Sequence, residues 1–495
     1  MVEPHFRAAN SELIHLHRNL GPGTLRLGGN KVELTRWQAE INPATLDKKT
    51  GLAVIGRTTL DDLYSFLKAT DWKCVHGINL AGNQPETSAD EAAYVLKIGS
   101  ASVLAFEVGN EPNLYNNHDL RKKDYDCGQY LPEAAKAIKV IRARNPGIIL
   151  AGPATARRTD HWFEDAVAGL KGQLTIGTSH LYALSGGSTN PKSANFPSIE
   201  NLLLPATMAK DVTMVDEHLA AAKAAGMRYR LAECNSISNG GRAGISDAFV
   251  AALWATDFLF SVAEHGADGI NFHSNLKEGS YSPFFARKSG GYQVQPLYYA
   301  MLLFREAGRG RILTATVKSE ANMTAHATIG TDGKLRVALT NKDLAREIIA
   351  HVSTGRTQGT IARLLAPSID AKTGITFAGA ATANDGKWSA IKTEPVAGSG
   401  SDLTVRRKWE RSHRTITGGQ RGRGDLGVRG RSETVHRAER EGASGHGDMG
   451  TRACARGHAG TGTRGHGDTR LREGARGHGD MGRGRAQRGQ HRGTG

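Results

Sequence analysis

Between residues 11 and 306, short apolar runs alternate with longer segments of helical periodicity. Each apolar run ends in polar residues or glycine, as a strand does where it leaves a buried sheet. The runs occupy 24–30, 74–80, 103–111, 148–153, 178–182, 229–233 and 269–274. The helical patterns between them include 59–70, 132–144, 214–225 and 247–265. Strand–helix alternation at this spacing predicts a parallel α/β sheet.

Two α/β architectures fit these runs. A doubly wound sheet is one, but no GxGxxG turn follows an early strand, and Gly28-Gly29-Asn30 is weak evidence for phosphate binding. A (β/α)8 TIM barrel is the other, and it has eight strands. The first recognisable element is a helix that begins at Ser11. We therefore predict that residues 1–306 form a (β/α)8 TIM barrel whose first strand lies upstream of Met1.

The pattern changes after residue 310. Alternating runs at 314–317, 323–329, 335–340 and 347–352 are separated by turn residues. They predict a C-terminal antiparallel β-sandwich domain over 311–400.

Residues 401–495 differ again, with 21 Lys/Arg against 10 Asp/Glu and few large apolar side chains. Such a segment buries too little surface to offset chain entropy, which predicts a disordered Arg/Gly-rich tail. Most of the formal charge of +16 comes from this tail. Arg/Gly repeats can bind nucleic acid electrostatically, but a basic excess confined to the tail does not favour nucleic acid as a partner.

Several classes of protein are not supported. The four cysteines form no CxxC pair, so neither a disulfide framework nor a zinc site is expected, and we expect no metal and no cofactor. No run of 18 or more apolar residues is present, which argues against a transmembrane helix and a membrane partner. The start of the chain does not read as a signal peptide. Localisation and oligomeric state are undetermined by these features.

Two glutamates stand at predicted strand ends. In Asn110-Glu111-Pro112, Pro112 cannot donate to a sheet and biases Glu111 toward extended backbone, so strand pairing should stop there. Glu233 ends another run 122 residues later. Barrel enzymes carry catalytic residues at the carboxyl ends of their strands, and retaining glycosidases need two carboxyl groups. We assign Glu111 as the acid/base and Glu233 as the nucleophile.

Neighbouring residues suggest supporting roles. Asn110 could hydrogen-bond a sugar 2-hydroxyl, a contact that strengthens in the transition state. Arg26 lies in an apolar strand, where an unpaired charge is costly, so we expect it to pair with Glu107 or Glu233. A structural ion pair and a positioning role for the nucleophile both remain open. Glu107 shares the strand face of Glu111 and is expected to be a partner in the barrel interior.

Further polar residues lie near other strand ends. His180 and Tyr182 could contact the nucleophile or the sugar, or could simply fill the barrel mouth. His273, Asn275 and Tyr281 follow the last strand and could belong to a substrate loop or to the scaffold.

With these residues assembled, the chain resembles glycoside hydrolase family 79, the group of β-glucuronidases and heparanase-like enzymes, from about Asn10 to Val396. The resemblance rests on the motifs Leu25–Asn30, Phe106–Pro112, Leu231–Ser236 and Gly291–Tyr299, with the trailing β-domain segments Gly374–Gly379 and Asp385–Trp388. It implies a glycoside hydrolase that removes a terminal β-linked uronic acid by retaining double displacement, with Glu111 and Glu233 in the assigned roles.

The resemblance also implies the partner, a glucuronide or a uronic-acid-containing glycan, and suggests a secreted or periplasmic location. Tyrosine and backbone groups hold the uronate carboxylate in such enzymes, and Gly240, Gly241, Tyr281 and Tyr292 are our candidates. Another retaining barrel glycosidase remains open, such as a β-xylosidase, an arabinofuranosidase or an endo-acting heparanase-like enzyme. So do an inactive truncated homologue and a carbohydrate-binding pseudoenzyme.

Overall fold

The computed structural model describes residues 5–156, 160–399, 402–406 and 422–429, all within one compact unit. Its main sheet has seven parallel strands in the order β1-β5-β6-β7-β8-β9-β10. Their bounds are Thr24–Leu27, Lys73–Ile78, Val103–Val108, Leu150–Thr155, Ile176–Leu184, Arg228–Ile237 and Ile270–Phe272. Each predicted run overlaps one of these strands, which confirms the predicted parallel α/β sheet.

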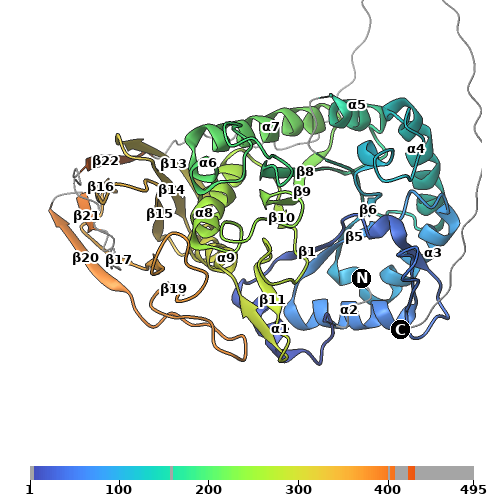
Figure 1. Cartoon of the computed structure of the whole chain (residues 1–495), viewed down its shortest axis with the longest axis horizontal. Coiled ribbons are helices and arrows are strands. Elements are labelled where there is room, and N and C mark those ends of the chain that lie inside the picture. Colours follow the sequence, from blue (N-terminus) through green and yellow to red (C-terminus); the bar gives the residue numbers. More distant parts are fainter. Residues whose placement is uncertain (1–4, 157–159, 400–401, 407–421, 430–495) are drawn as a thin grey trace, which may run out of the picture. The chain divides into compact units, whose positions relative to one another are not determined.

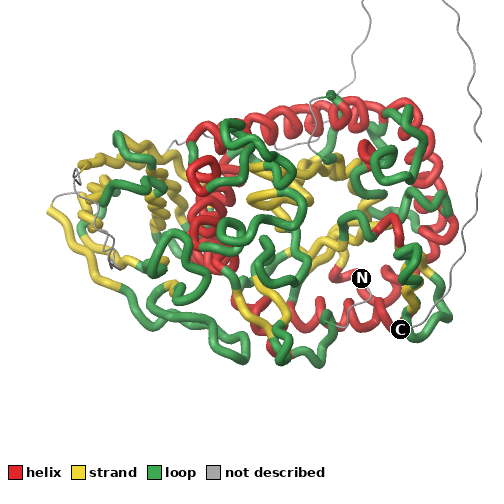
Figure 2. Tube along the Cα trace, in the orientation of Figure 1, coloured by secondary structure: helices red, strands yellow, loops and turns green. Residues whose placement is uncertain are grey.

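Helices surround this sheet (Figures 1 and 2). They are α1 (Ser11–Asn19), α2 (Arg57–Thr70), α3 (Pro85–Gly99), α4 (Cys127–Arg144), α5 (Trp162–Gly169), α6 (Ile199–Leu203), α7 (Pro205–Ala224), α8 (Phe249–Glu264) and α9 (Pro296–Ala307). A capping box sets the start of α4, where Asp126 accepts from the Gln129 N–H and the Gln129 side chain accepts in return. No helix in the described ranges is long and apolar enough to span a membrane.

The sheet curves into a nearly closed barrel. Strands β1 and β10 stand at the two ends of the strand order, and no ladder pairing joins them in the described part of the chain. The Asn271 side chain nevertheless donates to the Thr24 carbonyl at 2.8 Å, so the two end strands meet. The eighth strand expected upstream of Met1 stays a prediction.

Helix α8 is buried almost all round, because the barrel covers one side of it and strands β14 and β15 contact another. Most buried apolar residues of the described barrel, those of α8 and α9 included, form one core, and Ala105, Ala151 and Ile176 form a separate cluster on β6, β7 and β8.

The C-terminal β-domain is an eight-stranded sheet in the order β15-β14-β13-β22-β16-β21-β20-β17. Its strands are β13 (Arg311–Lys318), β14 (Met323–Ile329), β15 (Leu335–Asn341), β16 (Ile348–Ser353), β17 (Gln358–Ile361), β20 (Glu394–Ser399), β21 (Asp402–Arg406) and β22 (Gly422–Arg429). All pairs are antiparallel except β16 with β22. Met323 on β14 and Ile348 on β16 share one apolar cluster although their strands are not neighbours, so the sheet folds over itself.

Strands β21 and β22 move the edge of this domain beyond the predicted boundary at residue 400. The rest of the predicted tail, 407–421 and 430–495, lies outside the described residues.

Small elements complete the chain. Two-stranded sheets pair β11 (Phe284–Ala286) with β12 (Tyr292–Val294) and β18 (Leu364–Leu365) with β19 (Thr376–Phe377). A third small sheet joins β2 (Thr35–Trp37), β3 (Thr45–Leu46) and β4 (Ala53–Ile55). Short 3-10 helices are η1 (Val32–Leu34), η2 (Ser100–Ser102) and η3 (Pro112–Leu114). Of these, η1 and η3 lie next to the candidate site.

Candidate active site

The Asn-Glu-Pro segment forms a tight turn beyond the end of β6. The strand ends at Val108, three residues before Glu111, and Glu111 has a left-handed backbone with φ +50° and ψ +53°. The predicted extended backbone at Glu111 is therefore wrong. The Glu111 N–H donates to the Ala154 carbonyl at 2.9 Å, and Pro112 opens η3 directly afterwards, so tertiary contacts override the local bias of proline.

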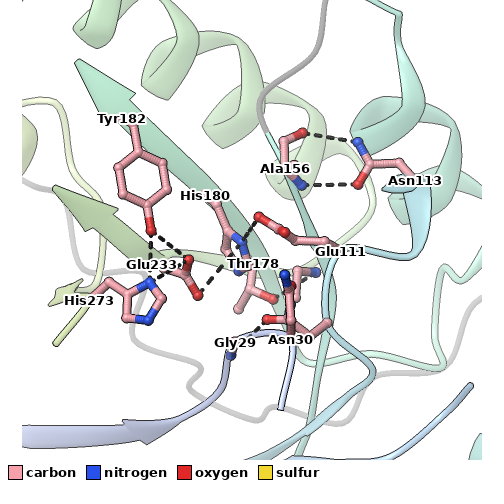
Figure 3. Close-up of polar contacts among 12 residues, drawn as sticks. Gly29, Asn30, Glu111, Asn113, Ala156, Thr178, His180, Tyr182, Glu233 and His273 are labelled. Carbon is pink, nitrogen blue, oxygen red and sulfur yellow. Dashed lines mark hydrogen bonds and ion pairs between the residues drawn. The ribbon is translucent and has the colours of Figure 1, made fainter. Parts of the chain in front are cut away.

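The structure brings the two predicted catalytic glutamates together. Glu111 follows β6. Glu233 lies within β9, which continues to Ile237, so the predicted strand end at Glu233 is wrong. One carboxylate oxygen of each and one ring nitrogen of His180 all lie within 4.8 Å of one another (Figure 3). Residues 122 positions apart in the sequence thus converge at one mouth of the barrel.

Glu233 is surrounded by donors. Its Oε2 accepts from Arg26 at 2.8 Å. Its Oε1 accepts from the Tyr182 hydroxyl at 2.7 Å and from His273 Nδ1 at 3.0 Å (Figure 3). Burial alone would raise the pKa of Glu233, but His273 and the Arg26 guanidinium together hold the pKa well below its usual range. Glu233 is therefore an ionised carboxylate at neutral pH.

Arg26 pairs with both of its predicted partners. Its Nε donates to Glu107 at 2.6 Å and one terminal nitrogen donates to Glu233. Burial alone would lower the pKa of Arg26, but Glu107 and Glu233 raise it above its ordinary value. Glu107 is fully buried, and its Oε1 has no hydrogen-bond partner among the described residues. Arg26 thus joins a structural carboxylate to the candidate nucleophile.

His180 contacts Glu111 through Nδ1 at 2.8 Å, while its Nε2 lies 3.1 Å from the second terminal nitrogen of Arg26. Because arginine can only donate, Nε2 must accept, and the ring proton then lies on Nδ1. His180 therefore donates to Glu111 Oε1.

Asn110, which directly precedes Glu111, is buried. Its Oδ1 accepts from the Gly29 N–H and from Arg26, both at 2.9 Å, and its Nδ2 donates to Asn30 at 3.2 Å. The glycine-rich segment after β1 therefore supports this asparagine. The contact of Asn110 with a sugar hydroxyl stays a prediction.

Of the residues proposed to hold a carboxylate, Tyr281 and the glycine pair lie together. The Tyr281 hydroxyl is 3.1 Å from His273 Nδ1, and its ring centroid is 6.0 Å from that of Tyr182. The Tyr281 N–H donates to the Gly240 carbonyl at 3.4 Å. Gly240 and Gly241 both have φ of +91°, which suits glycine.

Tyr292 contacts residues near the start of the chain, and its role in holding a carboxylate stays a prediction. It lies on β12, and its hydroxyl contacts His5 Nδ1 at 2.7 Å and the Asn10 side chain at 2.8 Å. Its backbone N–H donates to Glu12. The β11–β12 hairpin directs this tyrosine toward the start of α1.

The site contacts of two residues, Glu33 and His273, were not predicted from the sequence. Glu33, on η1, is buried and accepts four hydrogen bonds from loops around the site. An acid between two apolar residues, Val32 and Leu34, was the available signal. His273 was expected only as a loop residue, but it contacts the candidate nucleophile directly. Its position directly after β10 was the signal.

The spacing of Glu111, His180 and Glu233 would also suit a metal ion. However, Arg26 already contacts Glu233 and His180, and its charge would repel a second cation. The donor set fits a hydrogen-bonded pair of carboxyl groups better than a metal site.

Comparisons with known proteins point to glycoside hydrolases. The chain is 26% identical to a heparanase of Gallus gallus over 305 residues, covering 58% of this chain and 55% of that protein. It is 24% identical to a β-glucuronidase of Neurospora crassa over 306 residues, covering 54% and 52%. These matches support the resemblance to glycoside hydrolase family 79. The chain spans about half the length of the curated relatives it matches, and no family model matches it.

Solved structures support the barrel fold. A 4-O-α-L-rhamnosyl-β-D-glucuronidase from Fusarium oxysporum 12S has a TM-score of 0.69 at 17% identity, covering 82% of this chain and 92% of that one. A GH51 arabinofuranosidase from Xanthomonas axonopodis pv. citri has a TM-score of 0.59 at 15% identity, covering 80% and 87%. The predicted TIM-barrel class is thereby confirmed.

Proposed function

We propose that this chain is a retaining glycoside hydrolase that removes a terminal β-linked uronic acid by double displacement. The observation that carries the proposal is the Glu111–Glu233 pair, in which one oxygen of Glu111, just after β6, lies within 4.8 Å of one oxygen of Glu233, within β9. Carboxyl groups about 5–5.5 Å apart belong to retaining enzymes, and separations of roughly 6.5–9.5 Å belong to inverting ones.

In the first step, an ionised Glu233 oxygen attacks the anomeric carbon as the glycosidic C–O bond breaks. Glu111 donates its proton to the leaving oxygen. His180 donates to Oε1 of Glu111, which leaves Oε2 to carry that proton. In the second step, Glu111 takes a proton from water as this water attacks the glycosyl ester and releases Glu233.

The choice of sugar rests on the relatives. The sequence matches are named heparanase and β-glucuronidase, and one structural neighbour is named a glucuronidase. Tyr281, placed beside His273 and the Gly240 carbonyl, is the best candidate for a contact to the uronate carboxylate. The partner is accordingly a glucuronide or a uronic-acid-containing glycan.

An aryl glycoside panel tests the proposal. We expect release of the aryl group from a β-D-glucuronide and not from the β-D-xyloside or the α-L-arabinofuranoside. NMR of the first-formed sugar should show the β-anomer. Glu233→Gln should lose at least about 10³-fold in kcat, whereas Glu91→Gln, at a buried carboxylate that contacts His76, should keep activity. Activity that survives Glu233→Ala, or an α-anomer as the first product, would contradict it.

An endo-acting, heparanase-like enzyme is the second candidate, favoured by the match to the Gallus gallus heparanase. Size-exclusion analysis of a heparan-type glycan separates the two, since endo action shortens the chains before free uronate appears. Calorimetric binding of a glucuronide with no turnover would instead indicate a carbohydrate-binding pseudoenzyme.

A further inference from the structure

Glu33 ties together three loops that surround the candidate site. It lies on η1, after β1, and its side chain is buried. Its Oε2 accepts from the backbone N–H groups of Leu80 at 3.0 Å and Ala81 at 2.8 Å, directly after β5. The segments that follow β1 and β5 are therefore joined by one carboxylate oxygen.

The other oxygen holds the Asn-Glu-Pro turn. Glu33 Oε1 accepts from the Asn110 N–H at 2.7 Å and from the Tyr115 hydroxyl at 2.5 Å, at the two sides of Glu111 in the sequence. Burial raises the pKa of Glu33, while the four hydrogen bonds favour its ionised form. A carboxylate offers about four acceptor positions, and four donors meet it here. A side chain with fewer acceptors could not hold the same loops.

This arrangement controls the backbone of Glu111. The left-handed conformation at Glu111 costs free energy and persists only where neighbours fix it. The backbone N–H of Asn110, the residue before Glu111, donates to Glu33. The backbone N–H of Glu111 itself donates to the Ala154 carbonyl. The direction in which the Glu111 side chain leaves the turn, toward His180, follows from these two bonds (Figure 3).

We propose that Glu33 is a positioning residue for Glu111 and acts through the backbone N–H of Asn110. This inference rests on the proposed function, in which Glu111 is the acid/base. Glu33 does not touch the sugar. It sets the distance between the Glu111 carboxyl group and the leaving oxygen.

The kinetic test uses substrates that differ in their need for an acid. In Glu33→Gln, an NH2 group replaces one acceptor oxygen and faces two donors. We expect kcat/KM to fall about 10²-fold for phenyl or methyl β-D-glucuronide, but only a few-fold for the 4-nitrophenyl glycoside, whose leaving group needs little protonation. Tyr115→Phe, which removes one donor from Oε1, should show a weaker loss with the same selectivity.

Matched variants separate positioning from general destabilisation. Glu91→Gln changes a carboxylate of similar burial, and it should not lower kcat/KM for one substrate more than for the other. In a Glu111→Ala background, Glu33→Gln should cause no further loss, since the group that it positions is gone. Equal losses for both substrates, or additive losses in the double variant, would overturn the inference while leaving the proposed function intact.

A crystal structure of Glu33→Gln gives a readout that does not depend on turnover. We expect Glu111 Oε1 to leave hydrogen-bonding distance of His180 Nδ1, with β6 and β9 unchanged. A retained contact would overturn the inference. If the wild-type protein hydrolyses no glycoside, the proposed function fails, and this structure still decides whether Glu33 positions Glu111.

Discussion

His180 donates from Nδ1 to Glu111 Oε1 over 2.8 Å. Its other nitrogen accepts from Arg26, which in turn donates to Glu233. One imidazole and one guanidinium thus connect the two carboxyl groups that the proposed mechanism uses. A proton shift at one glutamate is therefore felt at the other through a short chain of hydrogen bonds.

Replacing His180 should impair the acid/base more than the fold. His180→Ala removes the donor to Glu111 and the acceptor for Arg26. A hydrogen bond to a charged group contributes about 1.5–3 kcal/mol, so kcat/KM for an aryl glucuronide should fall roughly 10–100-fold. The pH profile of kcat/KM is the measurement. His265→Ala, at an ion pair with Asp216 beyond the end of α8, is the control, and an unchanged profile in His180→Ala would contradict the assignment.

Tyr182→Phe should raise the pKa of the nucleophile. The Tyr182 hydroxyl donates to Glu233 Oε1 at 2.7 Å, and a donor to the ionised form lowers the pKa of a carboxyl group. Without it, the acidic limb of kcat/KM should move to higher pH, and kcat should fall about 10-fold. Tyr292→Phe, which also loses a phenol hydroxyl but one that contacts His5 and Asn10, should keep the wild-type profile. Identical profiles for the two variants would count against this role of Tyr182.

Arg26→Met should destabilise the barrel strongly. It leaves Glu107 and Glu233 buried without their shared cation, and removal of one partner from a buried ion pair costs about 3–5 kcal/mol. Urea unfolding followed by circular dichroism measures the change. The double variant Arg26→Met/Glu107→Met should recover part of the loss, because fewer unpaired charges remain. A single variant as stable as the wild type would rule out this structural role of Arg26.

His326 links the β-domain to α8. Its Nε2 contacts Asp257 at 2.9 Å and its Nδ1 contacts Glu264 at 2.8 Å, while Lys342 also pairs with Asp257. Burial alone would lower the pKa of His326, but the hydrogen bonds to Asp257 and Glu264 raise it to about 9. The protonated imidazole therefore belongs to the folded state at neutral pH.

This raised pKa predicts a stability that declines in alkali. The ordinary pKa of histidine is 6.5 and the folded value is about 9. The contribution of His326 is thus fully present below about pH 6.5 and is lost as the pH rises through 9, to a total of about 3 kcal/mol. Urea unfolding at pH 6, 7.5 and 9.5 measures it. His326→Gln should flatten this dependence, and an equal slope in both proteins would exclude the interaction.

The repeating pattern of the barrel was readable because it depends on local chemistry. Runs such as 103–111 and 229–233 combine apolar side chains with a polar end, and the structure has a strand in each. The two glutamates were found for the same reason, since each stands beside or within such a run. The boundary at residue 400 was not readable, because whether the polar segments Asp402–Arg406 and Gly422–Arg429 pair with β16 depends on a neighbour far along the chain.

The sequence by itself determined the strand–helix order, the two glutamates and the presence of a basic C-terminal segment, since these follow from residue types over a few positions. Only the tertiary structure decided the left-handed turn at Glu111, the contacts of Tyr292 with His5 and Asn10, and the four bonds to Glu33. Those features arise where loops from different strands meet. There, hydrogen bonds between residues such as Glu33 and Asn110, 77 positions apart, outweigh the local backbone preference.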